Sequence, residues 1–207
     1  MNVDILYETD FEYALFGLGL SFGQTSGTLF CDFKTNIKDV NKLFELSKKL
    51  AYTTGGENKF LRMINVILDI NMPLYWYKEF DTYKVGTVAQ SESTMHTIMN
   101  NQFHMEQFEI TNVTDISHLN KTIEHLNKLR YNYIKEISSD VRKQYFYQVI
   151  KDLPSSWLQR RIVMLNYSVL QNIIKHRFNH KLNEWRYFCS TLLNNLKLAC
   201  YLDRDKL

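Results

Sequence analysis

The segment from Leu153 to Arg177 constrains this chain most, because polar residues recur inside an otherwise apolar run. The apolar residues after Pro154 predict a strand, and the spacing of apolar residues beyond Asn166 predicts a helix that a second helix follows. Asn166, Asn172 and Arg177 lie where a purely structural segment would carry apolar side chains. Buried amides and guanidinium groups need hydrogen-bond partners. The segment therefore predicts a strand-helix-helix unit that meets a polar ligand.

The length and composition of the chain fit one globular domain. Its 207 residues suffice to bury a core, and 45% hydrophobic with 23% charged residues is ordinary for a folded protein. We therefore expect a single domain over residues 1–207, with a helical layer at about 116–150. Aromatic residues reach 14%, and because tyrosine is common at protein interfaces, an oligomer is expected.

Charge and cysteine content exclude several classes of partner. A net charge of +3 is too small for a nucleic-acid surface, and the basic groups Arg160-Arg161 and Lys175-His176-Arg177 are short. The three cysteines show no C-x-x-C spacing, which favours reduced thiols. The sequence has neither a signal-like start nor a run of about eighteen apolar residues, so we expect a cytoplasmic protein without a membrane partner.

The first third of the chain predicts one strand and two helices. Residues 13–22 are apolar and contain Gly17 and Gly19, which weaken a helix, so we expect a strand there. These glycines and a third, four residues later, are followed by turn-like residues that do not fit a dinucleotide-binding helix. Apolar residues recur at helical spacing over residues 39–51 and again over about 57–71, which predicts two helices.

Helices dominate the expected structure of the rest of the chain. The aromatic segment over residues 74–85 fits either a strand or a helix, and the hydroxyl side chains at 91–94 are typical of a helix start. An amphipathic helical region over 116–150 is expected to break near Ser138-Ser139. A last helix is expected over about 183–202.

Two segments of the chain resemble the flavin-dependent thymidylate synthases. In that family Leu-Pro is followed by a strand, an Asn, a second Asn, an Arg, and a Gln-Trp-Glu-Ile-Arg-like segment. A similar series occurs here at Leu153-Pro154, Asn166, Asn172, Arg177 and Asn183-Glu184-Trp185-Arg186. Asn replaces the Gln, and the Glu-Trp-Arg order requires a slip of one residue. Upstream, the family places a helix, a proline-led strand and Gln-x-x-Arg-His-Arg, which align with residues 57–84, with Pro73 in register.

The resemblance implies an α+β fold with a central, mostly antiparallel sheet flanked by long helices. It implies an enzyme that uses FAD for the reductive methylation of a pyrimidine deoxynucleotide such as dUMP. The implied co-substrates are NADPH and methylenetetrahydrofolate. The resemblance also implies a homotetramer whose sites are shared between subunits.

The resemblance also assigns roles to individual positions. Arg177 would bind the substrate and act in catalysis, because a guanidinium stabilises negative charge on a pyrimidine carbonyl. The implied FAD contacts are Tyr83, Lys84, Asn166, Asn172 and Asn183. The further implied substrate contacts are Glu79, at the family's glutamine, and Ser91 or Ser93, at its phosphate-binding serine.

The chain departs from the family pattern at several cationic positions. Thr82-Tyr83-Lys84 stands at the family's Arg-His-Arg, so only Lys84 keeps a charge there. Ile150 and Ser168 stand at two further arginines, and Glu57 at a flavin-side histidine. Because cations hold phosphates, two alternatives to the enzyme stay open. One is a protein of the same fold that binds a nucleotide without catalysis, and the other is a structural homo-oligomer without a ligand.

Plainer roles for single residues also stay open. Arg177 fits an ordinary surface cation, and Asn166 fits a cap for the helix after it, a role compatible with ligand contact. His176 and His180 have the spacing of a metal pair, but no third ligand follows and Phe178-Asn179 is expected to end the helix. No metal is therefore expected. Tyr83 is the aromatic residue expected to stack on a ligand ring.

Overall fold

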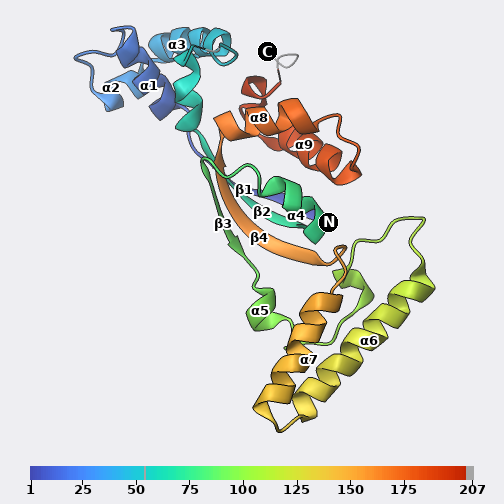
Figure 1. Ribbon diagram of the computed structural model, residues 1–207. Coiled ribbons are helices and arrows are strands. Elements are labelled where there is room, and N and C mark those ends of the chain that lie inside the picture. Colours follow the sequence, from blue (N-terminus) through green and yellow to red (C-terminus); the bar gives the residue numbers. More distant parts are fainter. Residues whose placement is uncertain (54, 204–207) are drawn as a thin grey trace. The chain divides into compact units, whose positions relative to one another are not determined.

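The computed structural model describes residues 1–53 and 55–203, and Figure 1 shows their elements coloured along the chain. The chain divides into two compact units. Unit 1 comprises Met1–Asn2, Asn71–Phe80 and Gln90–Arg161. Unit 2 comprises Val3–Ile70, Asp81–Ala89 and the chain from Ile162 on. Each unit has a hydrophobic core of its own.

A four-stranded antiparallel sheet holds its strands in the order β1-β2-β4-β3. Its strands are β1 (Asn2–Glu8), β2 (Asn65–Pro73), β3 (Thr87–Ser91) and β4 (Leu158–Asn166). Two backbone hydrogen bonds of 3.0 Å fix the direction of β2 against β4, since Tyr167 donates to Ile64 and Leu74 donates to Trp157. With the helices, this sheet confirms the predicted α+β fold class.

Residues 57–71 do not form the predicted helix. They form the 3₁₀ helix η1 (Glu57–Arg62) and then β2. Six of the nine β2 residues are buried, so the strand shows little alternation between its two faces. An apolar run of this kind is typical of a strand buried on both faces, and spacing alone does not distinguish it from a helix. Pro73, expected to lead a strand, ends β2 instead, and the helix α4 (Leu74–Phe80) follows.

Residues 13–22 form a helix, so the predicted strand is wrong. The buried residues of α1 (Glu12–Ser21) recur at helical spacing. Gly19 lies so close to its neighbours that a Cβ there would be 2.5 Å from Thr25 Cγ2 and 2.9 Å from Leu43 Cδ1. Gly19 lowers the helix propensity of this segment, yet the close packing around α1 requires a glycine at this position.

Over its described residues, unit 2 contains five more helical elements besides α1 and η1. They are α2 (Phe30–Thr35), α3 (Ile37–Leu50), α8 (Tyr167–Arg177), α9 (Asn183–Asn195) and the 3₁₀ helix η3 (Ala199–Tyr201). The helix predicted over 39–51 is confirmed as α3, and β4, α8 and α9 confirm the strand-helix-helix prediction. The last helix is shorter than the expected 183–202, because Leu196 has an extended backbone.

Unit 1 consists mainly of a helical hairpin and the segments packed on it. Its helices beyond α4 are α5 (Thr94–Thr97), η2 (Met105–Gln107), α6 (Ile116–Lys135) and α7 (Ser139–Asp152). The break predicted near Ser138-Ser139 is confirmed, and the Ser138 hydroxyl accepts a hydrogen bond from Val141 N at the start of α7. Within the described ranges, no helix combines the length and apolarity that crossing a bilayer requires.

Candidate functional site

The helix α8 organises the candidate site in unit 2. Asn166 is its N-cap, and its Oδ1 accepts a hydrogen bond of 3.1 Å from Val169 N, as an asparagine in this position commonly does. The buried residues Leu170 and Ile173 anchor one face of the helix in the core. The opposite face of α8 is therefore held in a fixed orientation toward solvent.

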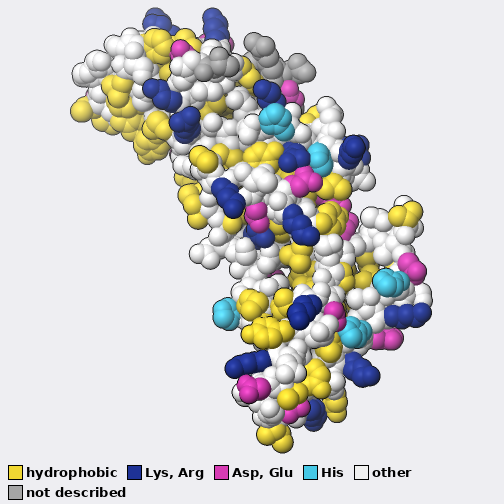
Figure 2. All heavy atoms as spheres, in the orientation of Figure 1, with side chains coloured by type: hydrophobic (Ala, Val, Ile, Leu, Met, Phe, Trp, Pro, Cys, Tyr) yellow, Lys and Arg dark blue, Asp and Glu magenta, His cyan; other side chains and the backbone are white. Residues whose placement is uncertain are grey.

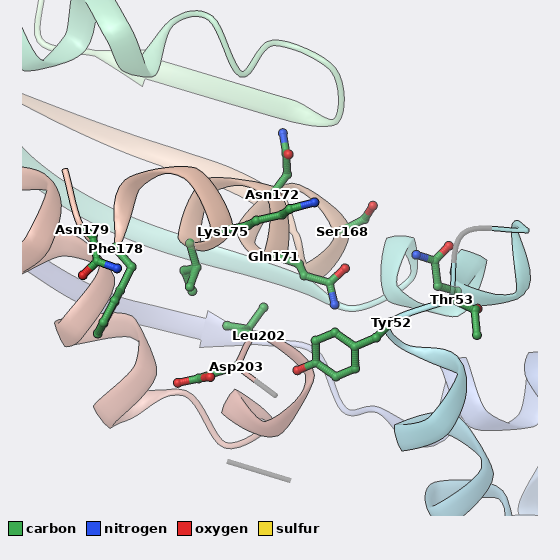
Figure 3. A pocket seen from close by; sticks show the side chains of 12 residues that line it. Tyr52, Thr53, Ser168, Gln171, Asn172, Lys175, Phe178, Asn179, Leu202 and Asp203 are labelled. Atoms are coloured by element: carbon green, nitrogen blue, oxygen red, sulfur yellow. The ribbon is translucent and has the colours of Figure 1, made fainter. Parts of the chain in front are cut away.

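That opposite face lines a cavity of about 830 Å³, which we call the α8 pocket. The buried Ile174 lines this pocket at its edge. The other lining residues on this helix and just after it recur every three or four positions, and so form one stripe: Ser168, Gln171, Asn172, Lys175, Phe178 and Asn179. Figure 3 shows these side chains on α8, with Gln171 directed toward Tyr52 and Asn172 projecting on the side of the helix away from Tyr52 and Asp203. Asn172, expected to contact FAD, thus lies in a cavity of suitable size for a small ligand.

Two short segments form the other walls of the α8 pocket. Tyr52, Thr53 and Asn58 come from the region between α3 and the end of η1, and Leu202 and Asp203 follow η3. Figure 3 shows Tyr52, Leu202 and Asp203 beside α8, on segments that come from separate parts of the chain. The pocket is therefore a product of tertiary folding within unit 2.

Hydrogen bonds tie α8 to both walls. The Gln171 amide nitrogen donates to Ala51 O at 3.1 Å and to Tyr201 O at 2.9 Å, so both amide hydrogens are used within the protein. The Tyr52 hydroxyl donates to Cys200 O at 2.7 Å. These bonds leave the Gln171 side-chain oxygen as an acceptor at the pocket.

The α8 pocket is nearly neutral in charge. Among its described lining residues, Lys175 is the one cation and Asp203 the one anion. The remaining polar groups are amides and hydroxyls, and Tyr52 and Phe178 add aromatic rings. Such a lining suits a planar heterocycle with carbonyl and N–H groups along its edge.

A second cluster surrounds Arg177 at the end of α8. Its Nε donates to the Tyr83 hydroxyl at 3.0 Å, and its guanidinium carbon lies 5.0 Å from the ring centroid of the buried Trp185. The Tyr83 and Trp185 rings meet edge to face, with centroids 6.1 Å apart. The structure thus brings together Arg177 and Tyr83, two residues that the sequence placed on different ligands.

Arg177 and Asn172 point to different sides of α8. Five residues of α-helix correspond to about 140° of rotation, so the two side chains diverge. Arg177 does not line the α8 pocket, whereas Asn172 does. Within one chain, Asn172, which was expected near the flavin, and Arg177, which was expected near the pyrimidine, therefore lie on two separate surfaces.

The other expected FAD contacts lie outside the α8 pocket. Asn166 packs beneath Gly86, where a Cβ would lie 2.8 Å from Asn166 Nδ2 and where φ is +79°. Lys84 is exposed in the turn just before Gly86. Asn183 is exposed at the start of α9, and its Oδ1 accepts a hydrogen bond from Arg186.

The further expected substrate contacts belong to unit 1. Glu79 is half-buried in the last turn of α4. Ser91 ends β3 and is exposed, whereas Ser93 precedes α5, where its carbonyl oxygen accepts a 2.7 Å hydrogen bond from the Thr97 hydroxyl. Of the two serines, only Ser93 stands directly before a helix, as the sequence pattern of a helix start requires.

The sequence pattern missed most of the pocket residues. Gln171, Lys175 and Asn179 belong to the same polar stripe as Asn172, and their spacing of three to four residues was a usable signal. Tyr52 and Asn58 carried no comparable signal. They precede α8 by more than a hundred residues, and only the fold brings them to the pocket.

The histidine pair does not form a two-residue face on one helix. α8 ends at Arg177, and His180 lies beyond it with Nδ1 accepting a hydrogen bond of 3.2 Å from Leu182 N. In the part of the chain that the structure describes, His, Cys, Asp and Glu form no group of three or more that would hold a metal ion. Burial raises the pKa of Cys189 to about 12, which keeps that thiol protonated.

Two solved structures resemble the whole chain. Thymidylate synthase X (ThyX) from Helicobacter pylori with FAD and dUMP, at 2.31 Å resolution, has a TM-score of 0.73 and 15% identity, over 100% of this chain and 99% of that chain. Flavin-dependent thymidylate synthase ThyX from Helicobacter pylori, complexed with FAD and dUMP, has a TM-score of 0.72 and 16% identity over 100% of both chains. No protein-family model and no curated protein matches the sequence. The likeness shows that the chain has the ThyX fold.

Proposed function

We propose that this chain, which has the ThyX fold, binds a flavin or a pyrimidine nucleotide in the α8 pocket. The observation that carries the proposal is the polar stripe of α8, which includes Asn172 and lines a cavity of about 830 Å³. Solved structures of the same fold contain FAD and dUMP, whose ring systems both carry an edge of carbonyl and N–H groups. Amides and hydroxyls are the groups that recognise such an edge.

The described pocket residues fit the ring of FAD better than its diphosphate. Ser168, Asn172 and the Gln171 oxygen supply donors and acceptors for a ring edge, and Phe178 supplies an apolar surface. A diphosphate requires cations or a cluster of backbone N–H groups. Lys175 is the one cation that the described lining provides. We therefore expect the ring of the ligand to supply most of its contacts with the pocket.

Ligand titration tests the proposal directly. Adding riboflavin, FMN, FAD, uridine or dUMP to the purified protein should quench flavin fluorescence or raise the melting temperature, because a ligand that binds the folded state stabilises it. Asn172→Leu should weaken binding about tenfold by removing one pocket hydrogen bond in a partly enclosed site. Asn41→Leu, on the exposed surface of α3, is the matched control and should leave affinity unchanged. A protein indifferent to all five compounds contradicts the proposal.

A second candidate function is the full reaction of a flavin-dependent thymidylate synthase. This reaction is the reductive methylation of dUMP with FAD, NADPH and methylenetetrahydrofolate. The contacts of Arg177 favour it, because a guanidinium held beside Tyr83 and Trp185 offers a fixed positive charge for a pyrimidine carbonyl.

Product analysis separates the two candidates. Formation of dTMP from dUMP in the complete mixture, lost in Arg177→Ala and kept in Arg62→Ala, supports the enzyme. Arg62 is exposed at the end of η1 and does not line the α8 pocket, so its replacement controls for loss of charge alone. Ligand binding without the formation of dTMP supports the first candidate, a protein that binds a nucleotide or flavin without this reaction.

We further propose that the protein assembles as a homotetramer, as the resemblance implies. Large apolar side chains are exposed on and around α1 and α2, and Figure 2 shows them gathered over these helices: Tyr13, Leu20, Phe22 and Leu29. Exposed apolar patches of this kind mark interaction surfaces. An assembly also gives a role to the two diverging faces of α8, since Asn172 of one copy can then meet Arg177 of another.

A further inference from the structure

We propose that Gln171 selects the ligand of the α8 pocket by accepting a hydrogen bond from one N–H group of the ligand ring. The ligand class is a planar ring whose N–H lies between two carbonyl groups, as in the uracil and flavin rings. This inference rests on the proposed function, because it names the feature by which the same pocket recognises its ligand. It adds a specificity-determining residue at a position to which the family resemblance assigns no role.

The side-chain amide of Gln171 is held in one orientation. Its Nε2 donates hydrogen bonds to Ala51 O at 3.1 Å and to Tyr201 O at 2.9 Å. Ala51 is the C-cap of α3 and Tyr201 is the last residue of η3, so both carbonyls lie at helix ends, where the helix itself offers no donor. Rotating the amide by half a turn would break both bonds and place its oxygen against two carbonyl oxygens. Gln171 therefore turns its N–H groups to the protein and presents its oxygen as the remaining polar atom.

This oxygen is an acceptor that a ligand can use. Gln171 is half-buried and lines the α8 pocket, and among the described residues no donor forms a hydrogen bond with its Oε1. A ligand that brings an N–H group to this oxygen replaces the hydrogen bond of a displaced water. A ligand that brings a carbonyl or a methyl group instead leaves the acceptor without a partner, which lowers affinity.

Two donors flank this acceptor on the same helix. Ser168 precedes Gln171 by three residues, Lys175 follows it by four, and both line the α8 pocket. Side chains at these spacings lie on one helix face, with about 5–6 Å between their Cβ atoms. The hydroxyl and the ammonium group are donors, so the stripe offers donor, acceptor and donor in turn. A ring edge of carbonyl, N–H and carbonyl is the complement of this series.

Ligands that differ in one methyl group test the inference on the unmodified protein. In 3-methyluridine a methyl group replaces the hydrogen of the ring N–H, whereas 5-methyluridine carries the same methyl group on a ring carbon and keeps the N–H. We expect 3-methyluridine to bind about tenfold more weakly than uridine, and 5-methyluridine to bind within about twofold of it, in titrations followed by melting temperature. Riboflavin and 3-methylriboflavin repeat the comparison by flavin fluorescence. The ring that binds more tightly identifies the source of the N–H.

Replacing Gln171 shows whether this residue causes the discrimination. Gln171→Met nearly keeps the shape of the side chain and removes its oxygen, so it should weaken uridine about tenfold and leave 3-methyluridine unchanged. Gln144→Met, on an exposed part of α7, is the matched control and should keep the discrimination. Gln171→Met also removes two hydrogen bonds within the protein. Circular dichroism of the ligand-free variant verifies its fold, and the comparison of ligands on the unmodified protein stands without it.

The possible outcomes separate this inference from the proposed function. Equal binding of uridine and 3-methyluridine, or equal weakening by the 3-methyl and 5-methyl groups, overturns the role of the N–H and leaves a ring-binding pocket in place. Discrimination that persists in folded Gln171→Met overturns the assignment to Gln171. Failure of every uracil and flavin compound to bind overturns the proposed function as well. A preference for the N–H that Gln144→Met keeps and Gln171→Met loses supports the inference.

Discussion

At the scale of single residues, Arg177 is held more firmly than a surface arginine. Its Nε bond to the Tyr83 hydroxyl and its position beside Trp185 fix a charged group on a half-buried surface. In the family pattern the Tyr83 position carries a cation-forming histidine, whereas here it supplies a neutral acceptor for Arg177. The substitution therefore changes which group this position serves.

Replacing Tyr83 by Phe tests how much this contact contributes. Loss of the hydroxyl removes an acceptor for a charged donor and should lower the free energy of unfolding by about 1–2 kcal/mol. Urea denaturation followed by circular dichroism measures the change. Tyr131→Phe is the control, because Tyr131 is 60% exposed on α6. Equal stability of the two variants would mean that the Tyr83 hydroxyl contributes nothing.

At the scale of elements, α1 shows how two similar glycines play different roles. A Cβ at Gly17 would meet Met63 Sδ at 3.4 Å, an ordinary contact, whereas a Cβ at Gly19 would meet Thr25 Cγ2 at 2.5 Å. Only Gly19 is therefore required by the packing of α1 on its neighbours. Helix propensity alone treats both glycines alike, and it therefore favours a strand for this segment.

Alanine at each glycine separates propensity from packing. Gly17→Ala should stabilise the protein by about 0.5–1 kcal/mol, because alanine favours the helix and the site has room. Gly19→Ala should destabilise it by about 1–3 kcal/mol, because neighbouring side chains must move. Thermal and urea unfolding of the two variants measure the difference. Stabilisation by both variants would contradict the close packing at Gly19.

At the scale of the whole molecule, two buried tyrosines make the stability depend on alkaline pH. Burial raises the pKa of Tyr167 and of Tyr201 above the ordinary value of 10.0, and for Tyr167 its hydrogen bond to Glu8 adds to the effect. Below pH 10.0 both groups keep their protons in the folded and the unfolded state. Above that pH the unfolded chain releases protons first, so the folded state loses stability as pH rises.

The alkaline loss of stability should be measurable by urea unfolding between pH 8 and 11. Each buried tyrosine contributes a slope of up to about 1.4 kcal/mol per pH unit above its unfolded pKa. Tyr167→Phe should remove about half of the combined slope. Tyr131→Phe, on an exposed tyrosine, should leave it unchanged. A slope that Tyr167→Phe does not alter would contradict the assignment to this residue.

Mixed oligomers test whether α8 faces from two copies share one site. Asn172→Leu and Arg177→Ala chains, each deficient in dUMP binding when alone, are expected to recover about a quarter of the binding sites when combined in equal amounts before assembly. Recovery requires that one site takes Asn172 and Arg177 from different chains. Sedimentation should show four times the 24.7 kDa chain mass in the same samples. Absence of recovery in a confirmed mixed tetramer would place the two residues at independent sites.

The sequence by itself determined the elements whose signals are local. The strand-helix-helix order of β4, α8 and α9, the cap at Asn166 and the break before α7 follow from spacing, capping chemistry and turn residues within a few positions. These features depend on neighbours in the chain, which a sequence displays directly.

The tertiary structure alone decided the elements and contacts that depend on distant residues. Helix α1 packs closely against Thr25 and Leu43 because Gly19 has no side chain. Strand β2 is buried on both of its faces, which favours a strand over a helix there. The α8 pocket exists because Tyr52 and Asp203 lie beside one face of α8. On another face, Arg177 donates a hydrogen bond to the Tyr83 hydroxyl. Such features depend on burial and on contacts between residues that are far apart in the sequence. The conformational propensities of neighbouring residues do not predict them.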